Sequence, residues 1–205
     1  MNQSIDANIK KLAAIAYGEA STLNDENEIA GIAFAVANRC RAWGGKTVQE
    51  LLAADEHYTY AIDGNNQRYE NFVRTRTMSE IENDKGMKIA WRAALIGWAN
   101  EGRDPSNGAF WWDGLDFKTN YAKHRKVRDG FRFGSESHNI FRVPERSSCV
   151  TVYRKLRDKN TGKDVDSKVR GQFNCVWVST AAHGQTIFWT HDKQYLATSG
   201  GKAYR

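Results

Sequence analysis

The spacing of apolar residues changes near residue 105, and this change constrains the fold more than any other feature of the chain. Up to about residue 100, apolar residues recur at the three-to-four-residue period of an amphipathic helix. A strong turn signal, Asp-Pro-Ser-Asn-Gly, follows at residues 104–108. From Val150 onward, apolar and polar residues alternate as they do in strands. We therefore predict an α+β fold with a helical N-terminal part.

Capping signals mark the starts of the predicted helices. The first helix is predicted over residues 5–20 and the second from about residue 24. A short helix follows Thr47, and a long one runs from residue 77 to about residue 100. The polar and aromatic segment 57–75 is predicted to be an irregular connection that can line a groove. The candidate N-cap residues are Ser4 or Asp6, Asn24 or Asp25 (with Glu28 at capping-box spacing), Thr47 (with Glu50) and Thr77 (with Glu80).

Two strands are predicted in the C-terminal part, over residues 149–156 and 169–179, joined by an Asn-Thr-Gly turn. The segment before them, residues 116–148, is basic and irregular. The chain shows neither an internal repeat nor a clean linker. We therefore predict a single domain over residues 1–205, a lysozyme-like helical core in which residues 116–180 form a basic insertion with a β-hairpin.

The charge and hydropathy of the chain limit its partners. A net charge of +6 and a pI of about 9.2 favour a polyanion, either nucleic acid, an acidic glycan or a membrane surface. Mean hydropathy is −0.67, and no apolar stretch is long enough to span a membrane. The first residues lack the basic and apolar regions of a secretory signal peptide, so we expect none. For action outside the cytoplasm, we expect either another export route or a sequence that has been trimmed.

The cysteines Cys40, Cys149 and Cys175 lack the C-x-x-C spacing of a zinc ribbon or a redox dithiol. Cys149 and Cys175 flank the predicted hairpin, and either a disulfide or a reduced, buried pair agrees with the sequence. We expect neither a metal nor a cofactor.

Glu19 lies at the end of the first predicted helix, after Tyr17 and Gly18. A carboxyl group pressed against apolar walls can keep its proton near neutral pH, because burial disfavours the charged form. Such a group can protonate a glycosidic oxygen as a general acid. The alternative is an ordinary polar residue in the last helical turn, and the position of Glu19 alone favours that alternative.

Several short segments follow one another in a recognisable order. They are Tyr-Gly-Glu-Ala at 17–20, Val-Ala-Asn-Arg at 36–39, His-Tyr-Thr at 57–59, Asp-Pro-Ser-Asn-Gly-Ala at 104–109, and Gly-Gln-Thr-Ile-Phe at 184–188, with residues 137–141 as the alternative for the last. In order and approximate spacing, these segments resemble the motifs of the spore-cortex-lytic, SleB-like cell wall hydrolases, mainly over residues 5–115. The chain departs from that family at His57, where the family has Gln, and in the insertion, which has no counterpart there.

The resemblance implies a lysozyme-like α+β domain in which Glu19 is the general acid. The bond cleaved is then the β-1,4 bond between N-acetylmuramic acid and N-acetylglucosamine of peptidoglycan. Similar domains occur in type VI secretion effectors, which implies action in the periplasm of a target cell and a cognate immunity protein as a further partner. The expected substrate-binding residues lie in or near these segments and include two neighbouring tryptophans. They are Tyr17, Asn38, Tyr58, Asp104, Asn107, Trp111, Trp112, Gln185 and Phe188.

The neighbouring residues Trp111 and Trp112 suit a glycan, because pyranose rings stack on aromatic planes. Burial in the core is the alternative for both. Adjacent side chains on a strand face opposite sides, so we expect only one of the two to line a groove.

A second carboxylate would decide the mechanism. A retaining glycosidase needs one about 5 Å from the acid, and an inverting one leaves roughly 6.5 to 9.5 Å for a water molecule. Asp63, Asp104 and Asp113 are the candidates. A lytic transglycosylase needs none, because the muramyl O6 closes on C1 and one Glu acts first as acid and then as base.

Other classes of protein would use other residues. A metal-dependent hydrolase would draw on His57, His124, His138, His183 and His191, which form no compact ligand motif. A cysteine nucleophile lacks a clearly exposed candidate. A nucleic-acid-binding domain or nuclease would use the basic run 123–128 with Tyr121, Phe131 and Phe133, but no nucleic-acid-binding motif accompanies them and we expect no such partner. A noncatalytic glycan-binding module would use the same aromatic residues as the enzyme.

Overall fold

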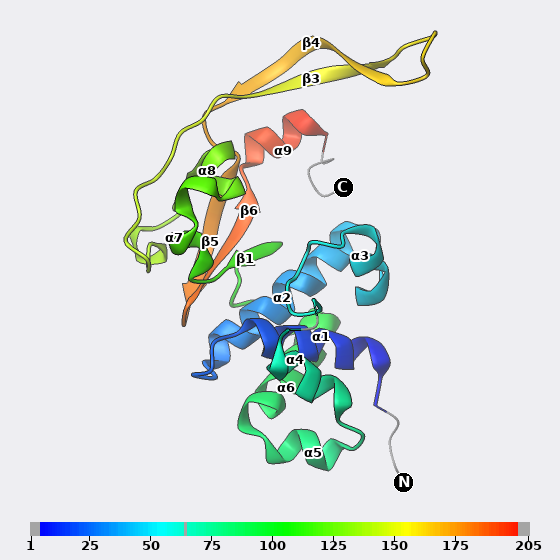
Figure 1. Cartoon of the computed structure of the whole chain (residues 1–205), viewed down its shortest axis with the longest axis vertical. Helices are drawn as coiled ribbons and strands as arrows, with labels where there is room; N and C mark the ends of the chain where they lie inside the picture. Colours follow the sequence, from blue (N-terminus) through cyan, green and yellow to red (C-terminus); the bar gives the residue numbers. More distant parts are fainter. Residues whose placement is uncertain (1–4, 64, 201–205) are drawn as a thin grey trace.

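The computed structural model describes residues 5–63 and 65–200, and it divides them into two lobes (Figure 1). Helices make up the helical lobe, residues 5–110, at the N-terminal end of the chain. Strands and short helices make up the sheet lobe, residues 111–200. The fold is therefore of mixed α and β type, as the change of pattern near residue 105 predicts. None of the helices in the described residues is both long and apolar enough to cross a membrane.

Helix α1 is the centre of the helical lobe, since it packs against α2, α4 and α6. Its side chains are buried almost all round because Ala13, Ala14 and Ala16 let the neighbouring helices approach closely. Gly18 serves the same purpose, because a Cβ there would lie 2.9 Å from the Cβ of Tyr69 on α4. The helices of this lobe are α1 (Ala7–Glu19), α2 (Glu26–Ala42), α3 (Val48–Ala54), α4 (Gln67–Arg74), α5 (Met78–Asn83) and α6 (Lys85–Ala99).

Capping residues set the helix starts that the sequence predicts. The side chains of Asp6 and Asp25 accept hydrogen bonds from the backbone N–H groups three residues later, at 2.9 and 2.8 Å. Thr47 forms a complete capping box with Glu50 at the start of α3, and Thr77 does the same with Glu80 at the start of α5. The alternative cap Ser4 lies outside the described residues.

Two predictions for the helical lobe are wrong. Residues 57–75 are not irregular throughout, because Asn66 caps helix α4 with a hydrogen bond from the backbone N–H of Tyr69. The long helix predicted from residue 77 is two helices, because Asp84 leaves the helical conformation and caps α6 through the N–H of Met87. The apolar period continues across this break, so the period alone does not reveal it.

The sheet lobe contains a four-stranded sheet with the order β1-β6-β5-β2. Strand β6 pairs antiparallel with both β1 and β5, whereas β2 pairs parallel with β5. Aromatic side chains, chiefly Phe117, Phe131, Trp177 and Trp189, fill its core. The elements of this lobe are β1 (Trp111–Asp113), α7 (Asp116–Thr119), η1 (Tyr121–Lys123), α8 (Arg125–Asp129), β2 (Phe131–Arg132), η2 (Glu136–His138), β3 (Val150–Arg157), β4 (Asp164–Phe173), β5 (Trp177–His183), β6 (Thr186–His191) and α9 (Lys193–Ser199).

Strands β3 and β4 form a separate hairpin that extends from the lobe beside α9 (Figure 1). The strand predicted over residues 169–179 is wrong, because β4 ends at Phe173 and β5, in the other sheet, begins at Trp177. The segment between them turns where the N–H of Val176 donates to the carbonyl of Gly130 at 2.9 Å. Cys149 and Cys175 are free thiols, and Cys149 is exposed rather than buried.

Glu28 on α2 joins the two lobes. Its buried carboxylate accepts hydrogen bonds from the hydroxyl of Ser21 at 2.5 Å, the N–H of Gln185 at 3.0 Å and the hydroxyl of Thr186 at 2.9 Å. Close to it, Gly31 packs on Phe188, whose Cζ would lie 2.5 Å from a Cβ at that position. The position of β6 against α2, and hence of β1 against the helical lobe, is therefore fixed by buried contacts.

Candidate active site

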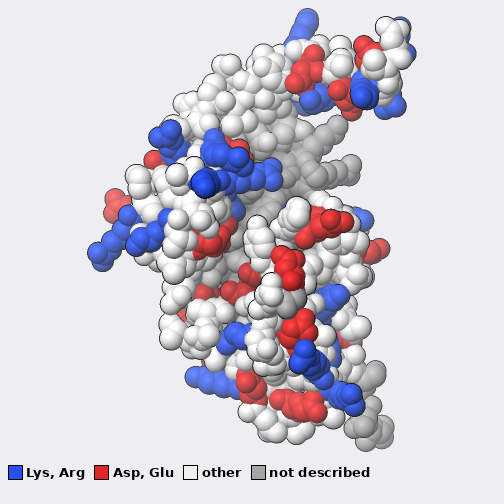
Figure 2. All heavy atoms as spheres, viewed as in Figure 1, with Lys and Arg blue, Asp and Glu red and all other residues white. Residues whose placement is uncertain are grey.

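A groove of about 480 Å³ runs between the helical lobe and the sheet lobe. The helical lobe contributes the end of α1 and the loop that follows α3. The sheet lobe contributes β1, α7, η1 and α8. Figure 2 shows blue side chains gathered over the region of α7 and α8, and red and blue side chains intermixed over the helical lobe. The residues that line the groove are Glu19, Asp55, His57, Tyr58, Thr59, Tyr60, Trp111, Trp112, Asp113, Gly114, Asp116, Asn120, Lys123, His124, Arg125, Lys126, Arg128 and Trp177.

Glu19 is the last residue of α1, and its half-buried carboxylate reaches into this groove. Oε1 accepts hydrogen bonds from the hydroxyl of Thr59 and from the backbone N–H of Ala61, the second at 2.8 Å. Oε2 accepts a longer one from the indole N–H of Trp112, at 3.3 Å. The carboxylate is thus fixed by donors from two distant parts of the chain, and one of its oxygens is held more tightly than the other.

The loop that presents Thr59 is anchored by Tyr58. The Tyr58 ring is buried, and its hydroxyl donates to the carbonyl of Phe110 at 2.8 Å. Burial raises the pKa of this phenol far above its usual value, so it stays a neutral donor. The ring also meets the edge of Trp112, with centroids 5.3 Å apart. Tyr58 therefore sets the positions of both side-chain donors to Glu19.

Trp111 and Trp112 point to opposite sides of β1. Trp112 turns toward Tyr58 and Glu19, whereas Trp111 packs on Trp177, with ring centroids 4.9 Å apart, and under the guanidinium of Arg39. Both nevertheless line the groove, which contradicts the expectation that only one does so. The reason is that β1 is an edge strand, so the groove reaches residues on both of its sides.

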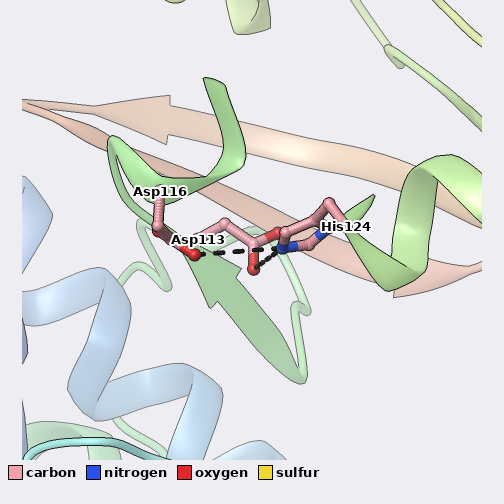
Figure 3. A group of neighbouring side chains, drawn as sticks. All are labelled: Asp113, Asp116 and His124. Carbon is pink, nitrogen blue, oxygen red and sulfur yellow. Dashed lines mark ion pairs between the residues drawn. The ribbon is translucent and has the colours of Figure 1, made fainter. Parts of the chain in front are cut away.

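Asp113, at the end of β1, lies next to Asp116 and His124 (Figure 3) and forms an ion pair with Lys126. The Lys126 Nζ lies 3.1 Å from Oδ1 and 2.9 Å from Oδ2, and His124 Nε2 lies 3.3 Å from Oδ1. Asp116 is half-exposed and 3.9 Å from the same His124 nitrogen. Asp113, Lys126 and His124 have side chains that are 8 to 14% exposed, so this network is largely shielded from solvent.

A metal ion is a possible occupant of this network, since ligand atoms of Asp113, Asp116 and His124 all lie within 4.8 Å of one another. The ammonium of Lys126 already donates a hydrogen bond to Oδ1 of Asp113, however, and lies 2.9 Å from Oδ2. Lys126 is itself buried against the ring of Trp177, 4.8 Å from its centroid. A cation would therefore have to displace a packed lysine.

Several predicted site residues support the fold and do not line the groove. Asn38 Nδ2 donates to Asp104 Oδ2 at 3.0 Å and to the carbonyl of Ala109 at 3.1 Å, and Asp104 also accepts bonds from Ser106 and Gly108. These two residues therefore shape the turn that leads into β1. The Asp104 carboxylate accepts its hydrogen bonds from Asn38 and within that turn and does not line the groove, so Asp104 is not placed beside Glu19 as a second carboxylate.

The remaining predicted site residues do not line the groove, because they are either buried in the core or exposed on another surface. Tyr17 is buried against Phe72 and Arg68, and Phe188 is fully buried in the core. Asn107 is exposed and donates to the carbonyl of Thr180, while Gln185 is exposed at the turn between β5 and β6. Asp63 is exposed outside the groove.

The sequence does not indicate Thr59 as a partner of Glu19, Asp55 as a groove residue, or the pairing of Asp113 with Lys126. Asp55 forms an ion pair of 2.6 Å with Arg39, whose guanidinium is buried among Trp43, Tyr58 and Trp111. These pairings arise between segments far apart in the chain, and no local pattern encodes them. The basic run 123–128 is the one signal in the sequence for this wall of the groove.

Two alternatives are weakened by the structure. Burial raises the pKa of the Cys40 and Cys175 thiols to about 11, so both are protonated at neutral pH and poor nucleophiles. Cys149 is exposed, contrary to the expectation that no cysteine is, but it does not line the groove. Phe131 beside the basic run is 1% exposed and is therefore unable to stack on a base.

No protein-family model matches the chain, and neither a curated protein nor a solved structure does. Function is therefore inferred from the groove itself.

Proposed function

We propose that this protein is a lysozyme-type glycosidase that cleaves the glycan strands of peptidoglycan, with Glu19 as the general acid. One observation carries the proposal: a fixed carboxyl group at a helix end reaches into an open groove that also contains aromatic side chains and further carboxylates. A general acid needs a fixed position beside the bond that it protonates, and this arrangement supplies one.

The hydrogen bonds of Glu19 suggest which oxygen transfers the proton. Oε1 accepts from the Thr59 hydroxyl and the Ala61 N–H, so its lone pairs are occupied. Oε2 has only the longer bond to the Trp112 indole. We assign the proton to Oε2, from which it moves to the glycosidic oxygen as the bond to the anomeric carbon breaks.

Aromatic side chains of the groove suit a sugar substrate. The Tyr60 side chain is 72% exposed at the groove, and Trp112 is partly exposed next to Glu19. Pyranose C–H faces stack on such rings, while neighbouring polar groups fix the orientation of the sugar. A glycan chain laid along these rings would pass the Glu19 carboxyl group.

Asp113 is the remaining candidate for a second carboxylate among those predicted, and in a hydrolytic mechanism we assign it the stabilisation of the oxocarbenium-like transition state. Its ion pair with Lys126 suits a fixed charge better than a base that must take a proton.

A lytic transglycosylase acting on the same bond is the second candidate. Two other acidic side chains of the groove form ion pairs, Asp55 with Arg39 and Asp113 with Lys126, and Asp116 lies 3.9 Å from a His124 nitrogen. A mechanism that needs only one free carboxyl group fits this pattern, because Glu19 can act first as acid and then as base.

The proposal is tested by the turbidity of a peptidoglycan suspension. The wild-type protein should lower it, and Glu19→Gln should lower the rate at least 100-fold, since a general acid contributes about 10² to 10⁴. The matched control is Glu26→Gln, an exposed acid on the next helix, which should keep full activity. Circular dichroism should be unchanged in both variants. Full activity in Glu19→Gln, or none in the wild type, would contradict the proposal.

Mass spectrometry of the released fragments separates the two chemistries. Hydrolysis leaves reducing muramyl ends, whereas transglycosylation leaves anhydromuramyl ends that are lighter by one water. The products of the wild-type protein therefore decide whether a water or the muramyl O6 attacks the anomeric carbon.

A further inference from the structure

The sheet-lobe side of the groove carries cations that are not matched by acids. Lys123, Arg125 and Arg128 line the groove, and all three are exposed. Arg125 lies 3.4 Å from Asp129, but its side chain is 77% exposed, so this pair is solvent-screened and weak. Within the described residues, neither Lys123 nor Arg128 has an acidic group at ion-pair distance. Their charge therefore faces the groove largely unneutralised.

Arg128 also lines a second, smaller cavity next to the groove. This cavity has a volume of about 410 Å³ and includes Tyr121, Arg128, Arg146, Ser147 and Ser148. Arg146 is exposed and likewise lacks an acidic partner among the described residues. Two arginines and two serines thus line one space. We call Lys123, Arg128 and Arg146 the cationic wall.

The donor set of the cationic wall fits an anion with two oxygens. A guanidinium has only donors and matches a carboxylate or phosphate with two parallel hydrogen bonds. Because Arg128 belongs to both spaces, a group bound in the smaller cavity can be continuous with a chain bound in the groove. The wall is therefore placed to hold an anionic branch of a ligand whose main chain passes Glu19.

The distribution of charge along the sequence agrees with this placement. Residues 1–110 contain 12 Lys and Arg and 15 Asp and Glu, a net charge of −3. Residues 111–205 contain 18 Lys and Arg and 9 Asp and Glu, a net charge of +9. The excess of positive charge therefore lies in the part of the chain that carries the cationic wall, and such an excess attracts an anionic ligand.

We propose that the cationic wall binds the carboxylates of the peptide branches on the glycan strand, so that the protein selects peptide-bearing, anionic glycan over neutral glycan. This inference rests on the proposed function and names the class of its substrate. Nucleic acid fits the wall less well, because Phe131 is buried and the Tyr121 ring packs against Phe117 and Phe131, with centroids 6.1 and 6.2 Å apart.

The test uses the full-length Glu19→Gln protein, which should bind the ligand without cleaving it. Two soluble probes are compared, a disaccharide that carries its tetrapeptide and the same disaccharide without the peptide. We expect the first to bind at least about tenfold more tightly, the effect of one charge-assisted hydrogen bond. Arg128→Glu with Arg146→Glu should abolish this preference.

The matched control is Arg154→Glu with Arg157→Glu on the hairpin, which makes the same change in net charge at exposed positions. The control should keep the preference, and Arg128→Lys with Arg146→Lys should keep part of it, which excludes misfolding as the cause of the loss. Equal affinity for the two probes, or equal losses in both charge-reversed proteins, would overturn the inference. Displacement of the peptide-bearing probe by millimolar inorganic phosphate, or by a single-stranded oligonucleotide in preference to it, would overturn it as well.

The inference and the proposed function fail separately. If wild-type protein cleaves peptide-free and peptide-bearing glycan equally well, the function stands and the role of the cationic wall is wrong. If the probes show the preference but no glycan is cleaved, the wall binds carboxylates and the enzymatic function is wrong.

Discussion

The two lobes that border the groove differ in how they are built and in the charge that they carry. The helical lobe packs alanine-rich helices tightly and ends its central helix at Glu19, which accepts hydrogen bonds from residues 59, 61 and 112. The sheet lobe has an aromatic core, and its groove side consists of short helices rich in Lys and Arg. Under the proposed function, the rigid helical lobe supplies the reacting group and the cationic sheet lobe supplies substrate recognition.

This division matches a general requirement of catalysis. A reacting group must be held to within a fraction of an ångström, which a well-packed helix end achieves. Recognition of a charged, branched ligand needs donors at several points, which exposed side chains on short elements provide. Substitutions at the junction of the lobes, within the sheet lobe and at the contact with Glu19 test these differences separately.

The largest effect on stability is expected at the junction of the lobes. Glu28→Ala leaves the donors of Ser21, Gln185 and Thr186 without their acceptor. Hydrogen bonds to a charged group contribute about 1.5 to 3 kcal/mol each, and part of this loss is offset by removing a buried charge. We expect the free energy of unfolding in urea to fall by about 3 kcal/mol. The exposed neighbour Glu26→Ala should change it by less than about 0.5 kcal/mol, and a similarly small change in Glu28→Ala would show that the lobes are held together otherwise.

The next largest effect is the pH dependence of the free energy of unfolding, which we expect to arise from a histidine of the sheet lobe. His191 is buried between Trp111 and Trp177. Burial first, and then the nearby cations Lys126, Arg125 and Arg39, lower its pKa from 6.5 to about 3. Because the unfolded chain binds a proton near pH 6.5 and the folded one does not, this contribution to stability is complete above pH 6.5 and declines as the pH falls toward 3.

The expected loss from this one histidine is about 2 kcal/mol between about pH 7 and pH 5. Thermal or urea unfolding of wild-type protein and His191→Gln at both pH values measures it. The variant should lose less stability than the wild type on acidification. An identical pH dependence in the two proteins would mean that His191 takes up a proton in the folded state.

The smallest effect is expected at the contact between the lobes in the groove. Trp112→Phe removes the indole N–H that donates to Glu19 Oε2 but keeps an aromatic ring beside the substrate path. We expect a roughly tenfold loss in kcat with little change in KM, because the lost hydrogen bond helps to fix the carboxyl group that transfers the proton. Trp98→Phe on α6, outside the groove, is the matched control. An unchanged kcat in Trp112→Phe would show that the indole N–H does not contribute to catalysis.

The helical lobe is largely predictable from the sequence because its signals are local. Asp6, Asp25 and Thr47 cap helices where the sequence indicates, and Glu19 ends α1. The break at Asp84 is hidden because the residues on either side keep one apolar period. A capping residue inside a continuous apolar period is recognised only from the backbone conformation of the structure.

The sheet lobe is less predictable because its signals are tertiary. Strand β6 is buried on both faces, so it shows no alternation of apolar and polar residues, and the sequence reveals only a short motif around Phe188. The pairing of Asp113 with Lys126 joins an edge strand to a five-residue helix and leaves no trace in local spacing. The chemistry of Trp111 and Trp112 marks them as candidate site residues, but nothing in the sequence indicates the edge position of β1 that exposes both.

The most direct test of the separate roles of the two lobes measures kcat and KM for glycan cleavage in two variants. In Glu19→Gln, kcat should fall at least 100-fold, the contribution of about 10² or more expected of a general acid, while the affinity for peptide-bearing glycan is retained. In Arg128→Glu with Arg146→Glu, KM should rise about tenfold or more while kcat is retained. A Glu19→Gln protein with wild-type kcat would contradict the central claim that Glu19 is the reacting group.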